Sequence, residues 1–388
     1  MRDVEIKANL ARHRAHPEVS PEIYFHGLCT QLGNRVAPKT KIYLDTCYWV
    51  VMREASSGKP RQPEHAVLLD LLRQLVRSGR AVCPVSDAAY IETMQHAALE
   101  VRRATAAVMD ELSDGVCLRT EPERVSMELK RFMDDPAGSG GVEPALTWVK
   151  PGMVLGARVP FAEALDARNN RVTQKSFIDL MWNMTFLEMA DHDRDKDFSS
   201  VMNSSASRIN EKMVEYAPEI GSFKQAFAAE VSGTIKFFDD AAARLFLSDR
   251  LPGFTEAEVE KFKDSMQTML FNVFRLRPKL MAKRVPTLYV HAACHAAIRW
   301  DKGRRLNGHW LLDLHHACAA AGYHDVMFTE APLRALMCSG HLKLDKEFNM
   351  PVIANATAAV NYLRDKLTVD NGQPAGAPRD LRPAPGVI

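Results

Sequence analysis

Four acidic residues stand at or near the ends of predicted strands, and together they could hold a metal ion. Asp45 ends the apolar segment KIYLD, and Glu330 directly follows the apolar segment VMFT. Glu92 lies about one and a half turns into the helix predicted after AVCPVS, and Asp313 opens the helix predicted before VMFT. Sites in parallel α/β sheets form beyond the carboxyl ends of the strands. Four carboxylates meeting there would repel one another unless a cation neutralised them, and Mg²⁺ or Mn²⁺ prefers such oxygen ligands.

Each acid also has an ordinary structural role open to it. Asp45 could cap a turn, and Glu92 could be a solvent-exposed helix residue. Asp313 could be a helix acid favoured by the macrodipole, and Glu330 could cap the helix that follows it. The combination of the four, and not any one of them, favours a metal site.

The elements that must position these acids alternate between strand and helix. Strands are predicted at 41–45, 81–86, 115–120, 325–329 and 351–355. A single long helix, capped by Ser86 or Asp87 and running to about residue 108, is predicted after the second strand. Strands that alternate with helices predict a parallel sheet, so the expected fold class is α/β.

A long middle segment has helical periodicity and almost no strand signal. Since neither α/β portion is large enough for a good parallel sheet alone, we expect one α/β domain interrupted by a mostly α-helical insertion. The predicted parts are an N-terminal helical segment at 1–40, the two pieces of the α/β domain at 41–120 and 285–367, the insertion at 121–284, and a disordered tail at 368–388 that is rich in Pro and Gly.

Four motifs resemble the PIN domain, the fold of bacterial toxin-type ribonucleases and related nucleases. They are YLDT at 43–46, SDAAYIE at 86–92, DLHHACAAAGYHDVMFTE at 313–330, and the final VIAN strand with its helix. The family has Asp ending strand one, Glu on the helix after strand two, Asp opening a later helix and another acid after strand four. These positions match Asp45, Glu92, Asp313 and Glu330. The resemblance covers about 41–120 and 285–367, and the motif beginning at Asp313 is its most specific part.

The resemblance implies a PIN-like parallel sheet of order 3-2-1-4-5, with the segment at 115–120 as strand three. It also implies metal-dependent hydrolysis of phosphodiester bonds in nucleic acid, with RNA as substrate and Mg²⁺ or Mn²⁺ as cofactor. Thr46 or Ser86 would hydrogen-bond the site. An inhibitory protein partner is implied as well, because many toxin-type relatives have one.

Two departures from the family pattern stand out. Glu330 occupies a position where the family usually has Asp, and the helical insertion is far larger than in the small toxins. We expect the insertion to shape substrate access or to form a homodimer contact.

Two other functions are compatible with the sequence. The first is a non-catalytic PIN-like scaffold that binds nucleic acid or a protein partner. The presence of an acid at all four positions disfavours this function. The replacement of Asp by Glu at position 330 leaves it open. The second is a phosphohydrolase of small substrates. The absence of a Gly-rich phosphate loop and of a D-x-D motif at Asp45 disfavours it.

The adjacent histidines His315 and His316 suggest a zinc site at first sight. Neighbouring helix residues point about 100° apart, so the two are not expected to share an ion. His316 is three residues after Asp313 and on the same helix face, so we expect it to support the acidic site or contact a phosphate. His315 is expected to pack in the core.

A second histidine pair, His291 and His295, has the i, i+4 spacing that can bind zinc, with Cys294 beside it. The glutamate of an H-E-x-x-H motif and an obvious third ligand are missing. The favoured interpretation is a buried helix with hydrogen-bonded histidines.

A basic cluster lies just before Asp313 in the sequence. It consists of Arg299, Lys302, Arg304 and Arg305, with Trp300 and Trp310 beside it. Such a cluster could bind a phosphate backbone while an aromatic ring stacks on a base. The alternative is a solvent-exposed loop between two helices.

The composition sets limits on the class of protein. With 46% apolar and 25% charged residues, the 388-residue chain has the profile of a soluble globular protein. The formal net charge of +2 does not by itself indicate a nucleic-acid partner, so any basic surface that binds one must be local. Seven cysteines without a C-x-x-C pair argue against a disulfide framework or a zinc ribbon. No membrane span or signal segment is evident, so we expect no membrane partner and a cytoplasmic location.

Overall fold

The structure is a computed structural model of the chain. It describes residues 2–96, 98–136, 138, 147–156, 165–191, 198–248, 250–251, 253–301, 303 and 305–369. Two of the predicted basic residues, Lys302 and Arg304, lie outside these ranges, as does the tail beyond Val369. Across the described ranges, no helix is both long enough and apolar enough to cross a membrane.

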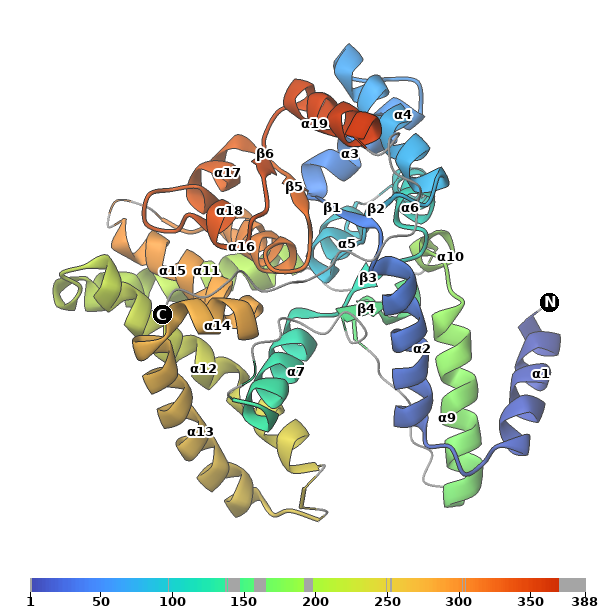
Figure 1. Ribbon diagram of the computed structural model, residues 1–388, viewed down its shortest axis with the longest axis horizontal. Coiled ribbons are helices and arrows are strands. Elements are labelled where there is room, and N and C mark those ends of the chain that lie inside the picture. The colour runs from blue at the N-terminus through green and yellow to red at the C-terminus, as the bar shows by residue number, and fades with distance from the viewer. Residues whose placement is uncertain are drawn as a thin grey trace.

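A small parallel sheet of four strands lies at the centre of a mostly helical molecule (Figure 1). The strands are β1 (Thr40–Leu44), β2 (Ala81–Val82), β5 (Val326–Phe328) and β6 (Val352–Ile353), and their order is β2-β1-β5-β6. Leu44 of β1 lies opposite Phe328 of β5. Ile42, Tyr43 and Leu44 are all fully buried, as expected for a parallel strand covered on both faces. The prediction of an α/β fold is confirmed at this level.

The predicted five-stranded order 3-2-1-4-5 is not confirmed. The segment predicted as strand three contains β3 (Cys117–Leu118), which pairs antiparallel with β4 (Trp148–Val149) in a separate two-stranded sheet. A single parallel bridge between Val85 and Cys117 connects β3 with the chain that follows β2. Strand β4 lies in a segment where no strand was expected, because two residues are too few to produce a recognisable alternating pattern.

Helices cover both faces of the sheet. One core contains Ile42 and Leu44 and is enclosed mainly by α3 (Thr46–Ser56), α4 (Pro63–Arg77), α6 (Leu99–Ser113) and α19 (Ala356–Val369). The other contains Tyr43 and Met327 and is enclosed mainly by α2 (Pro21–Val36), α15 (Pro286–Trp300), α16 (Gly308–Ala320) and α17 (Ala331–Met337), with α18 (Leu344–Glu347) beside it. Successive side chains of β1 therefore point to different cores.

The single helix predicted after the second strand is in fact two helices. Ser86 caps α5 (Asp87–Met94) as predicted, since its Oγ accepts a hydrogen bond from the Ala89 backbone N–H (3.2 Å). The backbone N–H of Gln95 then donates to the Glu92 carbonyl (3.4 Å), a tightening that is typical of a helix end. The apolar periodicity continues into α6, and for this reason the break was not predicted.

The middle segment is helical and packs against its neighbours on several sides. Its helices are α7 (Glu121–Asp134), α9 (Ala167–Trp182), α10 (Phe186–Ala190), α11 (Phe198–Tyr216), α12 (Phe223–Ser248), α13 (Glu256–Leu276) and α14 (Pro278–Arg284), with 3-10 turns at Pro151–Met153 and Ala217–Glu219. Helix α12 packs against α7, α13 and α15, whereas α9 packs against α1 (Arg2–Ala15) and α2. In Figure 1 both helix groups extend below the sheet, with α12 and α13 at the lower left and α1, α2 and α9 at the lower right.

Candidate active site

Two of the predicted acids meet at the carboxyl edge of the sheet. Asp45 follows β1 and is the N-cap of α3, and Glu330 follows β5 as the N-cap of α17. Because β1 and β5 are parallel neighbours in register, their carboxyl ends lie side by side. The backbone N–H of Glu330 donates to Asp45 Oδ2 (3.2 Å), so the two residues are in direct contact.

Asp45 has the capping role that the sequence offered as an alternative to metal binding. Its Oδ1 accepts hydrogen bonds from the backbone N–H groups of Cys47 (3.0 Å) and Tyr48 (3.3 Å), which caps α3. A carboxylate has about four lone-pair positions, so these three backbone contacts do not exhaust it. The side chain of Glu330 makes no capping bond and the residue is exposed, which leaves its carboxylate available.

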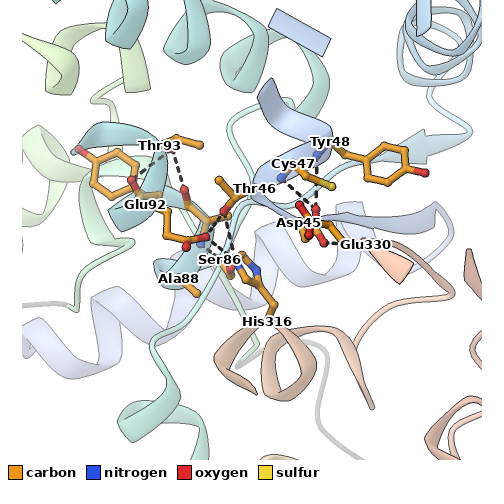
Figure 2. Close-up of polar contacts among 12 residues, drawn as sticks. Asp45, Thr46, Cys47, Tyr48, Ser86, Ala88, Glu92, Thr93, His316 and Glu330 are labelled. Carbon is orange, nitrogen blue, oxygen red and sulfur yellow. Dashed lines mark hydrogen bonds and ion pairs between the residues drawn. The ribbon is translucent and has the colours of Figure 1, made fainter. Parts of the chain in front are cut away.

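Glu92 was considered as an ordinary solvent-exposed helix residue, but its side chain is mostly buried. Its Oε2 accepts hydrogen bonds from His316 Nε2 (2.8 Å) and from the Thr46 hydroxyl, and the side chain is only 18% exposed. Figure 2 shows Glu92, Thr46 and His316 grouped together, with Asp45 and Glu330 on the other side of Thr46. Burial raises the pKa of Glu92, but His316 and Thr46 outweigh it, so the pKa lies below its ordinary value.

His316 belongs to the site, as its spacing from Asp313 predicted. Besides Glu92, it lies 3.1 Å from Thr46 Oγ1 through Nε2 and 2.6 Å from the Tyr43 hydroxyl through Nδ1. Burial lowers the pKa of His316, but the neighbouring carboxylates outweigh burial and hold the pKa above its ordinary value. The His316 ring thus lies on the Glu92 side of the acidic group.

Tyr43, on β1, contacts the other ring nitrogen of His316 and so orients the ring. Its hydroxyl lies within hydrogen-bonding distance of both His316 Nδ1 and Ser86 Oγ (2.8 Å), and all three residues are buried. Ser86 thus reaches the acids only through Tyr43 and His316, while Thr46 touches Glu92 directly. The role of Tyr43 was not predicted, because a tyrosine within an apolar strand is typical of a buried core.

Asp313 carries the most perturbed carboxyl group of the four. It lies in the second turn of α16, which begins at Gly308 behind an Asn307 cap, and not at the start of the helix as predicted. The macrodipole acts within the first turn, so it does not explain the position of Asp313. Burial, together with the carboxylates of Glu92, Asp45 and Glu330, raises the pKa of Asp313 to about 7 against the opposing effect of His316.

The four acids are close enough to shift the pKa of Asp313, but their oxygen atoms are not gathered around one metal position. Among the described residues, no three of them bring ligand oxygens within 4.8 Å of one another. The Cys47 thiol lies among Asp45, Glu330 and Asp313, and burial followed by these carboxylates raises its pKa. Uncompensated negative charge of this kind fits a hard divalent cation that is held partly through water.

A cleft of about 680 Å³ opens beside the first turns of α3 and α17. Its lining includes Cys47, Glu330 and Thr329, with His65 and Asn355 contributed by α4 and by the loop after β6. Within the described structure, Thr329 Oγ1 and His65 Nδ1 are buried without a hydrogen-bond partner. Buried polar atoms without partners are rare in folded proteins, so this cleft is suited to a polar ligand.

The basic cluster is only partly described. Arg299 Nη1 donates to Glu230 Oε1 (2.8 Å), so this guanidinium is engaged within the protein. Arg305 is exposed just before α16. Lys302 and Arg304 lie outside the described residues.

The second histidine pair proves to be part of a larger cluster. His291 Nδ1 lies 2.7 Å from Glu121 Oε1, and His315 Nδ1 lies 2.5 Å from Glu121 Oε2. Cys318 completes a group of three possible metal ligands with Glu121 and His291. The expectation of hydrogen-bonded histidines is confirmed for His291, whereas His295 stacks on the His291 ring. The third ligand was missed because Glu121 is 170 residues from His291 in the sequence.

Comparisons with models of protein families, with curated proteins and with solved structures find no match to this chain.

Proposed function

We propose that this protein is a metal-dependent nuclease that hydrolyses phosphodiester bonds in nucleic acid, with RNA as the preferred substrate. The RNA preference comes from the PIN resemblance. The parallel order β2-β1-β5-β6 and the bridge between Val85 and Cys117 are compatible with a PIN-like sheet of order 3-2-1-4-5.

One observation carries the proposal. Asp313 has a pKa raised to about 7 because burial and three neighbouring carboxylates act on it together. Strongly perturbed titratable groups are typical of functional sites, and the neighbouring Glu330 lines a cleft. A divalent cation is the ordinary way in which a protein balances several carboxylates in one place.

The residues would divide the work as follows. Asp45, Asp313 and Glu330 would hold Mg²⁺ or Mn²⁺, with Glu92 completing the negative side of the site. When bound, such an ion polarises a phosphate and lowers the pKa of a bound water. His316, fixed by Tyr43, keeps Glu92 ionised and oriented through its Nε2–H. Thr329 and His65 line the cleft where the nucleic-acid backbone would lie.

The test is cleavage of labelled single-stranded RNA and DNA by the purified full chain with Mn²⁺, Mg²⁺ or EDTA. We expect cleavage that requires metal, favours RNA and is lost in Asp45→Asn. The matched control is Asp264→Asn, the same substitution at an exposed position on α13. Equal cleavage in EDTA, or full activity in Asp45→Asn, would contradict the proposal.

A second function is favoured by a different observation. Because no three of the acids are gathered within 4.8 Å among the described residues, a non-catalytic scaffold that binds nucleic acid or a protein partner fits the same fold. The two proposals separate in one assay. A scaffold binds RNA in EDTA as well as in Mn²⁺ and leaves it intact in both.

A further inference from the structure

A second polar cluster lies among helices on the other side of α16 from the acidic site. Glu121 is the first residue of α7, His291 lies on α15 and Cys318 lies on α16. Each offers one ligand atom, and the three atoms lie within 4.8 Å of one another. Glu121 and Cys318 are buried, and the His291 side chain is 17% exposed.

We propose that Glu121, His291 and Cys318 bind a zinc ion that joins α7, α15 and α16. This site is separate from the acidic site and does not depend on the proposed nuclease function. Its chemistry is also different, since it offers nitrogen and sulfur in addition to one carboxylate.

The types of ligand select the type of ion. Thiolate and imidazole favour zinc and related transition metals, whereas Mg²⁺ and Mn²⁺ prefer oxygen. Structural zinc sites are tetrahedral with four protein ligands, and catalytic sites keep one position open. His315 Nδ1 lies 2.5 Å from the second oxygen of Glu121, beside these three ligands. Three protein ligands leave the fourth position of a tetrahedral zinc ion to water.

The hydrogen bonds now present occupy the space that the ion would take. The Glu121–His291 contact of 2.7 Å is shorter than the roughly 3.3 Å between two ligands of a tetrahedral zinc ion. Zinc would therefore replace the proton shared by Glu121 and His291, which would pass to solvent. The Cys318 thiol would lose its proton to solvent as the sulfur–zinc bond forms.

The surroundings hold the ligands in place. The backbone N–H of Glu121 donates to Asp87 Oδ2 (3.1 Å), and the His295 ring stacks on His291 with centroids 4.6 Å apart. Arg124 Nη2 donates to the Cys318 carbonyl (3.4 Å), and the Asp87 carboxylate supplies negative charge near this guanidinium. The His315 side chain is 36% exposed, so an ion can reach the cluster from solvent.

The experiment measures metal in the purified full chain. After incubation with zinc and dialysis, we expect one zinc ion per chain that Asp45→Asn does not remove. With Co²⁺ in place of zinc, we expect the near-ultraviolet absorption of a thiolate-to-cobalt charge transfer. That band should disappear in Cys318→Ser, and His291→Gln should reduce the bound metal at least tenfold.

Cys83→Ser is the matched control, since Cys83 is equally buried but belongs to the other core. Its cobalt band should equal that of the unmodified protein, and zinc should raise the Tm of both. Absence of bound zinc and cobalt in the unmodified protein would overturn the proposal, as would a band that survives in Cys318→Ser. If Cys318→Ser does not fold, the metal content of the unmodified protein and of His291→Gln decides.

Discussion

Two regions of this molecule pair a glutamate with histidine, and they do so with opposite charge balance. At the sheet edge, Glu92 is paired with one histidine and has three more acids around it. Among the helices, Glu121 lies between two histidines and no other acid contacts it through its side chain in the described part of the chain. In the first region carboxylates outnumber histidines, whereas in the second the Glu121 carboxylate contacts two histidines.

The pKa values follow this difference. Burial and neighbouring carboxylates raise the pKa of Asp313 to about 7, whereas two histidines hold the pKa of Glu121 well below its ordinary value despite burial. Surplus oxygen ligands suit a hard cation, and a compensated cluster with imidazole and thiol suits zinc. Burial alone thus does not set the pKa of a carboxyl group, because the charges and hydrogen bonds of its neighbours can outweigh it.

The largest expected effect is on catalysis. Asp313→Asn should reduce RNA cleavage in Mn²⁺ about a thousandfold, because it removes a charge that acts on the cation directly. Glu330→Gln should reduce it only about tenfold, since this carboxylate is exposed and its charge is screened by solvent. Initial rates at saturating Mn²⁺ check both values. A larger loss in Glu330→Gln than in Asp313→Asn would reverse the assigned roles.

The next effect is on stability and compares the two glutamates directly. Glu121→Gln should lower the free energy of unfolding by about 3 kcal/mol, because it leaves two partly buried histidines without their carboxylate. Glu92→Gln should lower it by about 1 kcal/mol, since its side chain is partly exposed and contacts only one histidine among the described residues. Urea unfolding in EDTA measures both variants without metal. If Glu92→Gln were the more damaging, the charge balance described above would be wrong.

A pH effect on the same helix sharpens the comparison. Glu128, two turns after Glu121 on α7, has a pKa that burial raises to about 8, although hydrogen bonds from Thr287 and the charge of Arg124 act in the opposite direction. Its folded pKa exceeds the ordinary value of 4.5, so its stabilising contribution is complete below pH 4.5 and is lost as pH rises through 8.

We therefore expect the stability difference between the unmodified protein and Glu128→Gln to shrink with rising pH. Over this range it should change by on the order of 2 kcal/mol. Urea unfolding at a series of pH values measures it. Parallel curves for the two proteins would show that Glu128 titrates normally.

The smallest expected effect concerns the basic cluster. Arg305→Ala should weaken RNA binding and reduce the slope of log affinity against log salt by about 1, because one phosphate contact is lost. Lys261→Ala, at an exposed position on α13, is the control and should leave the slope unchanged. An unchanged slope in Arg305→Ala would favour the solvent-exposed loop.

The sequence predicted what depends on local pattern. Asp45 and Glu330 follow apolar runs, so their meeting at the sheet edge follows from two parallel strands in register. The cap at Ser86 was likewise visible, because Ser and Asp precede an amphipathic helix.

Features that depend on packing between distant helices were not predictable. The contact of Glu92 with His316 spans 224 residues, and it exists because α16 packs against α5. The Glu121 cluster joins three helices in the same way. The prediction that Asp313 opens its helix was wrong. Helix α16 begins earlier, at Gly308, because Asn307 caps it ahead of the apolar run.

The most direct test of this account is anomalous diffraction from crystals of the full chain soaked with manganese and with zinc. The account predicts manganese at the sheet edge among Asp45, Asp313 and Glu330, and zinc between Glu121, His291 and Cys318. A sheet edge without manganese, or manganese bound only in the helix cluster, would contradict it.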